Sequence, residues 1–409
     1  MAKSGGGSKE DSVFENPLNP EKNCICPKPD ETQRISVIEN VNYTGVIENG
    51  KYTRKTHSAQ EECNTKIRVL YPGSIDAFIV PSGTAAVYTI ISASIATFKN
   101  KTPYILYASE LYSESHKFFT ELPNSHEVDI TIEIDESIMK LLTSIARHTP
   151  VIYFVETHSN PHGIRPNVNF LKFLGKQFQN LRVVFDNTML TSARFNPFHE
   201  YSDILNLSKM SVVCSASKHY SAGKTIAGFI VAGGRKQISK ILKVYKTVGY
   251  HVSPSICTHI SASIDTLSDR CKTSSNHTLN LVKHLNKFIE SNKIMASVLH
   301  VEPTDVFVVR IKRDSVQKLD KFNLASLCKQ PVQFVTSYGS ANTRVCNWVV
   351  IKDNYYNLRI SVGYLFHEQE SEIKESLEYM ISEVAHSEPR TVFNIDDQLT
   401  LHMNTFDVS

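Results

Sequence analysis

Between about residues 66 and 245 the chain alternates short apolar runs with longer amphipathic stretches, and this alternation constrains the fold more than any other feature. The amphipathic stretches, such as Thr84 to Phe98 and Phe170 to Gln179, have the periodicity of helices. The apolar runs predict buried strands at Ala77 to Val80, Tyr104 to Tyr107, Val151 to Val155, Arg182 to Phe185, Ser211 to Cys214 and Ala227 to Val231. Strands that alternate with helices predict an α/β fold, a mostly parallel sheet with helices on both faces. Ligands bind at the carboxyl ends of such strands.

One stretch, from Ala77 to Phe98, contains no charged residue and is long enough to cross a bilayer. Pro81, Ser82 and Gly83 interrupt it, and several Ser and Thr residues follow. Because such a turn breaks a continuous helix, we interpret the stretch as a strand, a tight turn and a helix. A membrane span is therefore not expected.

The remaining sequence predicts a division into four parts. Residues 1–50 are rich in polar and turn-forming residues and are expected to form an extended arm, disordered at its start. Residues 51–255 form the large domain that contains the sheet. Residues 256–390 are expected to form a smaller C-terminal α+β domain, and 391–409 a polar tail. In the smaller domain we expect a long helical region at about 256–291, strands at Val306 to Ile311, Trp348 to Ile351 and Leu358 to Val362, and a final helix near Gln369 to Val384.

Charge and cysteine content exclude several classes of protein. Lysine plus arginine (44) and aspartate plus glutamate (41) nearly balance, and no long run of either sign occurs, which disfavours a nucleic-acid binder. The eight cysteines are scattered, and Cys24 and Cys26 lack a second pair at zinc-ligand spacing, so no metal is expected. The first eight residues have no apolar core of the kind that a secretory signal needs. We expect a cytoplasmic protein.

The segment Ser211 to Thr225 admits two chemical interpretations. Gly223-Lys224-Thr225 after a strand matches half of a P-loop, but the glycine that the motif needs five positions earlier is Lys218. The alternative is that Lys218, just past an apolar strand, is a desolvated amine. Burial lowers the pKa of a lysine and makes its amine available to form a Schiff base.

Four other strand ends supply side chains that suit a pyridoxal-phosphate site. Asp186 ends one apolar run, and a protonated pyridine nitrogen is a suitable partner for it. Ser82-Gly83-Thr84 precedes a helix whose first amides can hold a phosphate. Asn160 follows a third strand, and Tyr112, after a fourth, can stack on a pyridine ring. Taken singly, each of these has an ordinary structural explanation as a cap, a turn residue or a core aromatic.

Together these residues give the chain a family resemblance. It resembles the cysteine and methionine metabolism group of fold-type I pyridoxal-phosphate enzymes, which includes cystathionine γ-lyase, cystathionine β-lyase, cystathionine γ-synthase and methionine γ-lyase. The matching motifs, in order, are Tyr52-Thr53-Arg54, Ser82-Gly83-Thr84-Ala85-Ala86, Leu111-Tyr112, Glu156 to Pro161, Asp186-Asn187-Thr188, Ser215 to Lys218, Ser337-Tyr338-Gly339 and Arg359 to Gly363. Their joint order and spacing make the match specific.

The resemblance implies a role for each matching residue. Lys218 holds the cofactor as a Schiff base and later moves the substrate Cα proton, while Asp186 keeps the pyridine nitrogen protonated. Tyr112 stacks on the ring and helps to deprotonate the incoming amine. Arg359 clamps the substrate carboxylate, and Asn160 and Ser337 complete the cofactor and carboxylate contacts. The implied phosphate ligands are Gly83, Thr84, Ser215 and Ser217, with Tyr52 and Arg54 from a neighbouring subunit, so at least a homodimer and usually a homotetramer is implied.

Three functions remain open at this stage. The leading one is a carbon–sulfur lyase acting on cystathionine, methionine or a related amino acid; the second is a γ-replacement enzyme of the synthase type. The third is a catalytically silent relative that serves as a binding subunit, which the intact Lys218 and Asp186 disfavour. The residues that choose the substrate depart from the family pattern, notably at Glu114, Thr336 and Tyr338.

Overall fold

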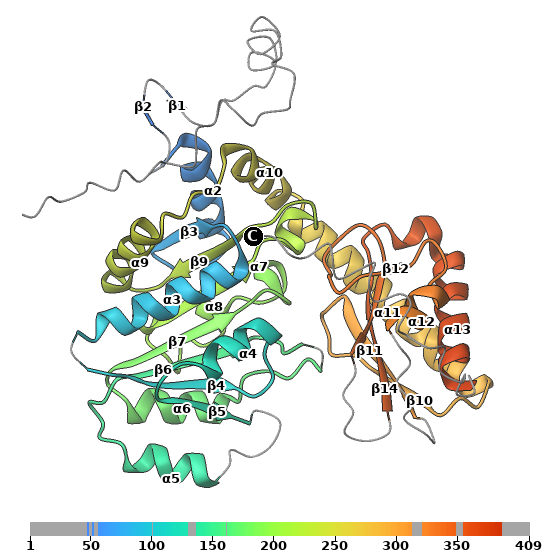
Figure 1. Cartoon of the computed structure of the whole chain (residues 1–409), viewed down its shortest axis with the longest axis horizontal. Coiled ribbons are helices and arrows are strands. Elements are labelled where there is room, and N and C mark those ends of the chain that lie inside the picture. Colours follow the sequence, from blue (N-terminus) through green and yellow to red (C-terminus); the bar gives the residue numbers. More distant parts are fainter. Residues whose placement is uncertain are drawn as a thin grey trace, which may run out of the picture.

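The chain contains two sheets of different size, each with its own helices (Figure 1). The computed structural model describes residues 47–48, 51–52, 56–99, 101–129, 136–160, 162–312, 321–348 and 355–386. The first two of these segments form a short antiparallel ribbon, β1 (Ile47–Glu48) with β2 (Lys51–Tyr52). The N-terminal arm, apart from this ribbon, and the tail from residue 387 lie outside the described residues.

The larger sheet has seven strands in the order β3-β9-β8-β7-β6-β4-β5. Its strands are β3 (Asp76–Val80), β4 (Tyr104–Ala108), β5 (Ser125–Val128), β6 (Val151–Glu156), β7 (Leu181–Asp186), β8 (Met210–Ser215) and β9 (Gly228–Ala232). All neighbours pair in parallel except β9, which runs antiparallel to both β3 and β8. The prediction of a mostly parallel sheet is thus confirmed. Strand β5 was not predicted, because it is a short edge strand in which only Val128 is buried.

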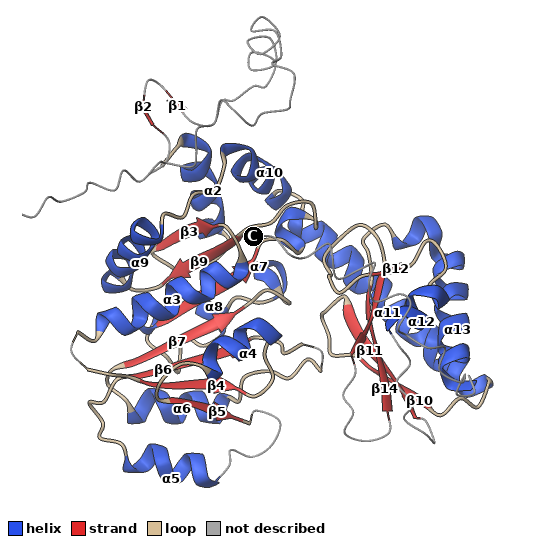
Figure 2. Ribbon diagram, viewed as in Figure 1, coloured by secondary structure: helices blue, strands red, loops and turns tan. Residues whose placement is uncertain are grey.

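Helices cover both faces of this sheet, since every residue of β6 and of β9 is buried. Figure 2 shows α3 (Gly83–Thr97) lying across the sheet, where it packs against α9 (Arg235–Val248), β8 and β9. The other helices of this part are α2 (Ser58–Val69), α4 (Ser113–Thr120), α5 (Glu136–Ser144), α6 (Val168–Gln177), α7 (Thr191–Arg194) and α8 (Pro197–Glu200), with 3-10 turns at Leu207–Lys209 and His219–Ser221.

The uncharged stretch folds as predicted into β3, a turn and α3. Ser82 caps the helix, because its Oγ accepts a hydrogen bond of 3.0 Å from the amide of Ala85. None of the helices in the described part of the chain is both long and apolar enough to span a membrane.

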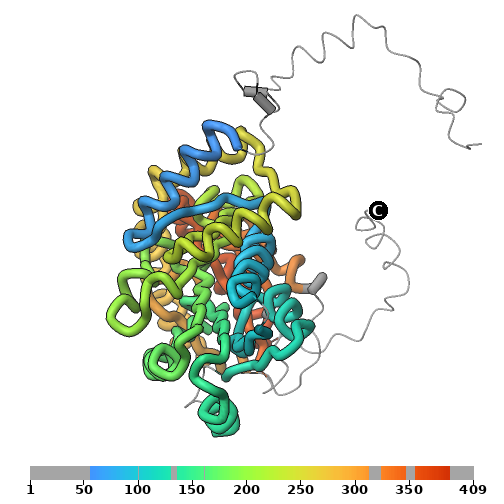
Figure 3. The backbone as a smooth tube through the Cα atoms, turned by 90° about the vertical axis from the view of Figure 1, so that its left-hand side faces the viewer, coloured from blue at the N-terminus to red at the C-terminus, as the bar shows by residue number. Residues whose placement is uncertain are grey.

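Two helices lead from the larger sheet to the smaller one. The single helical region predicted at 256–291 is broken at Asp265 and Thr266 into α10 (Pro254–Ile264) and α11 (Leu267–Ser291). Helix α10 packs beside α2, which is distant in sequence (Figure 3). The buried residues of α11 up to Cys271 belong to the core of the larger sheet, and those from Leu281 onward belong to the second core. The domain boundary proposed at residue 255 stays a prediction.

The smaller sheet has five strands in the order β10-β11-β14-β13-β12. These are β10 (Ala296–Leu299), β11 (Val306–Lys312), β12 (Gln333–Phe334), β13 (Arg344–Trp348) and β14 (Tyr355–Ser361). Helices α12 (Lys321–Leu327) and α13 (Glu370–His386) and a 3-10 turn at Phe366–Gln369 complete this part. The final helix is confirmed. Of the strand predicted at Trp348 to Ile351, only Trp348 lies among the described residues, where it belongs to β13; residues 349–354 lie outside them, so the rest of that strand stays a prediction.

Candidate active site

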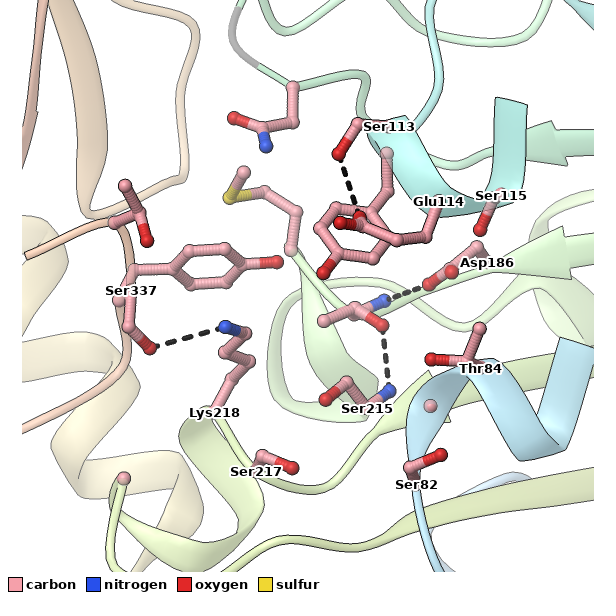
Figure 4. A pocket seen from close by; sticks show the side chains of 18 of the residues that line it. Ser82, Thr84, Ser113, Glu114, Ser115, Asp186, Ser215, Ser217, Lys218 and Ser337 are labelled. Carbon is pink, nitrogen blue, oxygen red and sulfur yellow. Dashed lines mark hydrogen bonds between the residues drawn. The ribbon is translucent and has the colours of Figure 1, made fainter. Parts of the chain in front are cut away.

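A cavity of about 980 Å³ lies between the carboxyl ends of the larger sheet and the edge of the smaller one. It is lined by every predicted site residue whose side chain the structure describes: Gly83, Thr84, Tyr112, Asn160, Asp186, Ser215, Ser217, Lys218, Ser337 and Arg359. Figure 4 labels Thr84, Asp186, Ser215, Ser217, Lys218 and Ser337 among them. The side chain of Tyr52 and all of Arg54 fall outside the described residues. Residues spread over 277 positions of sequence thus meet in one pocket.

Lys218 lies in the connection between β8 and β9 and projects into the pocket (Figure 4). Its Nζ donates a hydrogen bond of 3.1 Å to Oγ of Ser337, which belongs to the other part of the chain. Burial, together with the charges on Arg359 and Arg344, lowers the pKa of Lys218 to about 8. The neutral, nucleophilic amine is therefore a larger fraction near neutral pH than in an ordinary lysine, although the protonated form still predominates at pH 7.

Two carboxyl groups lie side by side at the ends of parallel strands. Glu156 of β6 and Asp186 of β7 are paired in register, and Oδ1 of Asp186 accepts a hydrogen bond of 2.9 Å from the Thr188 amide. Burial raises the pKa of Asp186 to about 6, and burial and the Asp186 charge raise the pKa of Glu156 well above its usual range. The pair therefore suits a positively charged ring nitrogen.

Glu156 was not among the predicted site residues. It carries the same signal that singled out Asp186, a carboxylate directly at the end of an apolar strand. Its Oε1 accepts a hydrogen bond of 2.7 Å from the backbone amide of Tyr112, so it also holds the start of α4 in place.

The start of α3 forms a cradle against the end of β8. A Cβ at Gly83 would lie 2.8 Å from Cβ of Ser215, so only glycine allows this close approach. Gly83 and Thr84 carry the first amides of the helix, which have no partner within the helix. Such amides suit a phosphate group. The Ser217 hydroxyl, in contrast, is already bound to the carbonyl and the amide of Ala227, both at 3.1 Å.

Tyr112 and Glu114 form another wall of the pocket. Tyr112 is 46% exposed, and burial together with Glu114 raises the pKa of its phenol to about 12. Glu114 accepts a hydrogen bond of 2.7 Å from Oγ of Ser113, and although burial opposes ionisation, bonds from Ser113 and Tyr112 lower the pKa of Glu114. Tyr112 is therefore a phenol at neutral pH, so proton removal by it requires a change in its surroundings.

Arg359, on β14, is buried at the far side of the pocket from the larger sheet. Its Nη1 donates to Oδ1 of Asn160 at 2.9 Å, and its Nη2 donates to the carbonyl of Thr336 at 2.8 Å. The ring of Tyr338 lies 5.2 Å from Nζ of Lys218 and 6.0 Å from Cζ of Arg359. Arg359 is thus held rigidly beside the amine.

These residues fit a phosphorylated aldehyde cofactor with a ring nitrogen. Each functional group of such a cofactor has a partner here: the aldehyde has the amine of Lys218, the ring nitrogen has the carboxyl pair at Asp186, and the phosphate has the cradle at Gly83. Within the described residues, no three His, Cys, Asp or Glu side chains cluster as metal ligands.

The sequence as a whole agrees with this fit. The model of the Cys/Met metabolism PLP-dependent enzyme family matches residues 37–336, which is most of the chain. The chain belongs to this family, and its cofactor is pyridoxal phosphate. The resemblance stated from the motifs is confirmed, although Ser337 and Arg359 lie beyond the matched range.

Two curated relatives are lyases of sulfur amino acids. L-Methionine gamma-lyase of Porphyromonas gingivalis is 25% identical over 240 residues, 58% of this chain and 56% of that enzyme. Cystathionine gamma-lyase of Saccharomyces cerevisiae is 25% identical over 170 residues, 40% of this chain and 41% of that enzyme. The matches thus span about half the length of these relatives.

Two solved structures share the fold over most of the chain. A putative O-acetylhomoserine (thiol)-lyase from Campylobacter jejuni, which contains a pyridoxyl-lysine monophosphate, has a TM-score of 0.64 at 15% identity, covering 86% of this chain and 91% of that one. The metB protein of Corynebacterium glutamicum has a TM-score of 0.63 at 15% identity, covering 82% and 88%. The predicted fold class is confirmed.

Proposed function

We propose that the protein is a carbon–sulfur lyase that removes a thiol from Cβ or Cγ of a sulfur amino acid and forms ammonia and a 2-oxo acid. The observation that carries the proposal is the position of Lys218: an amine of lowered pKa, 3.1 Å from Ser337 and in one pocket with Asp186 and Arg359. Methionine and cystathionine gamma-lyases among the relatives support elimination over replacement.

Lys218 would bind the cofactor covalently and then act as the base that removes the Cα proton. When bound, pyridoxal phosphate supplies an electron sink for the carbanion that this proton loss creates. Lys218 suits both tasks, because its lowered pKa leaves the amine able to accept a proton near neutral pH. In the same pocket, Asp186 would hold a proton on the ring nitrogen.

Arg359 would bind the substrate carboxylate with its planar guanidinium. Because Asn160 and Thr336 fix that guanidinium, the carboxylate position and therefore the Cα–H bond are oriented toward Lys218. Tyr112, on another wall, would stack on the ring, and it would receive the proton of the incoming amine once the bound cofactor and substrate have lowered the pKa of its phenol.

Gly83, Thr84 and the hydroxyl of Ser215 would bind the phosphate. The Ser217 hydroxyl would join them by exchanging its bond to the Ala227 carbonyl for one to the phosphate. Tyr52 and Arg54 of a neighbouring subunit would complete it, which makes a homodimer the smallest active unit and a homotetramer the expected assembly. The six cysteines within the described residues are all free, which supports a location in the cytoplasm.

The test is to supply cystathionine, methionine and an activated homoserine ester separately, and to measure thiol, ammonia and 2-oxo acid. We expect 2-oxo acid from at least one of the sulfur amino acids, and its loss in Lys218→Ala. Lys236→Ala, which removes an exposed lysine on α9, is the matched control and should retain the activity. If no substrate yields 2-oxo acid but an added thiol is incorporated with the ester, the protein is instead a γ-replacement enzyme.

A further inference from the structure

The pocket contains a second arginine that none of the roles above requires. Arg344, the first residue of β13, lines the cavity together with Lys218 and Arg359. Its Nη1 lies 3.9 Å from the position that a Cβ on Gly223 would take, close to the loop that carries Lys218. Arg344 thus extends from the smaller sheet toward the loop between β8 and β9 of the larger one.

The register of the smaller sheet explains why both arginines line the same cavity. Arg344 pairs with Ser361 and Cys346 pairs with Arg359 across the antiparallel strands β13 and β14. Arg344 and Arg359 are therefore diagonal neighbours on one face, with backbones about 7–8 Å apart. Two guanidinium groups at this spacing can each bind a different anionic group of one small molecule.

Arg344 has no anionic partner among the described residues. Its Nε is buried without a hydrogen bond, and within the described part of the chain no carboxylate forms an ion pair with it. The carboxylates that line the cavity have other partners: Glu114 accepts a hydrogen bond from Ser113, Glu156 from the Tyr112 amide and Asp186 from the Thr188 amide. Arg344 as a whole is partly buried, so the cost falls mainly on this buried Nε, and a ligand anion would reduce it.

The other cationic side chains of the cavity differ from Arg344 in their surroundings. Arg359 is already fixed by Asn160 and Thr336 beside the amine of Lys218, as expected for the group that binds the α-carboxylate. Lys224, which also lines the cavity, is exposed at the same loop as Gly223. The cavity therefore carries positive charge in addition to that of the group expected to bind the α-carboxylate.

We propose that Arg344 binds a second anionic group, a carboxylate or a phosphate, at the end of the substrate side chain. This inference rests on the proposed function. It narrows the substrate class to amino acids whose side chain ends in an anionic group, which would be preferred over amino acids with a neutral side chain such as methionine. Arg344 is then a specificity-determining residue, and it takes no part in proton transfer.

The test compares two ligands that differ only in the distal group and have no leaving group: L-2-aminohexanedioate, which ends in a carboxylate, and L-2-aminohexanoate, which ends in a methyl group. Their dissociation constants are measured by calorimetry with the full chain loaded with pyridoxal phosphate. We expect the dioate to bind about 10- to 100-fold more tightly to the wild type. Arg344→Gln should remove this preference, and Arg344→Lys should keep part of it.

Arg235→Gln, an equal loss of charge at the exposed start of α9, is the matched control and should keep the full preference. Equal binding of the two ligands to the wild type, a preference that persists in Arg344→Gln, or no binding of either ligand would each overturn the inference. Because neither ligand can undergo elimination, these results are independent of the lyase assay, so failure of the inference and failure of the proposed function are distinguishable.

Discussion

Nη1 of Arg359 donates a hydrogen bond of 2.9 Å to Oδ1 of Asn160, a residue 199 positions earlier in the chain. Asn160 follows β6 of the larger sheet, whereas Arg359 lies on β14 of the smaller sheet. The proposed carboxylate-binding group is therefore positioned by both parts of the molecule. Any change in their relative placement would move Arg359 with respect to Lys218.

This geometry predicts that Arg359→Lys impairs substrate binding although it preserves the charge. Lysine has its donors on a single nitrogen, so it cannot reproduce the planar fork in which separate nitrogens reach Asn160 and Thr336 and still bind a carboxylate with two hydrogen bonds. We expect kcat/KM to fall about 10- to 100-fold in steady-state assays of 2-oxo acid formation. Arg310→Lys, on the adjacent strand β11 and outside the pocket lining, is the control that should leave kcat/KM unchanged. An Arg359→Lys enzyme with wild-type kcat/KM would contradict the assignment.

A second prediction concerns the close approach of Gly83 to Ser215. In Gly83→Ala, the new Cβ would lie 2.8 Å from Cβ of Ser215, so the helix start must shift away from the cradle. Such overpacking costs about 1–3 kcal/mol, and we expect the affinity for pyridoxal phosphate, measured by equilibrium dialysis, to fall at least about tenfold. Thr84→Ser keeps the hydroxyl and should retain the affinity. Equal affinities in the two variants would mean that the phosphate lies elsewhere.

Directly after Lys218, His219 takes part in a buried ionic cluster. Oδ1 of Asp305 lies 3.1 Å from Nη1 of Arg194 and 3.3 Å from Nε2 of His219. Although burial opposes protonation, the Asp305 charge raises the pKa of His219 to about 9. Burial likewise opposes ionisation of Cys271, but the charge on His219 lowers the pKa of that thiol to about 7.

The two shifts predict opposite effects of pH on stability. The charged His219 contributes stability that is complete below its unfolded pKa of about 6.5 and is lost as pH rises through about 9. The ionised thiol of Cys271 contributes stability that grows as pH rises from about 7 to 9, so the two effects partly cancel in the wild type. To isolate His219, we compare the single variant Cys271→Ala with the double variant Cys271→Ala, His219→Gln. The difference between their free energies of unfolding is the contribution of His219, and we expect it to fall on the order of 2 kcal/mol between pH 6.5 and 9. Denaturant titrations at both pH values measure this, and a difference that is independent of pH would refute it.

The fold and the cofactor chemistry were readable from the sequence because they depend on local signals. Apolar runs marked most strands of the larger sheet, and polar residues directly after them marked Asp186, Asn160 and Lys218. Polar or partly exposed strands gave no such signal, which is why β5 and the start of β13 at Arg344 were not predicted.

The substrate side of the site was not readable, because it depends on the register between strands. Arg344 begins a strand and has no local feature that distinguishes it from an exposed arginine. Only the pairing of β13 with β14 places it beside Arg359 in the cavity. The cluster of Arg194, His219 and Asp305 likewise joins segments that no sequence pattern connects.

The most direct test of the central claim is to locate the lysine that carries the cofactor. The purified protein, loaded with pyridoxal phosphate, is reduced with borohydride, digested and mapped by mass spectrometry. We predict a pyridoxyl phosphate adduct on the peptide that contains Lys218, and none in Lys218→Ala. An adduct on another lysine such as Lys224, or no adduct on any peptide, would contradict the account.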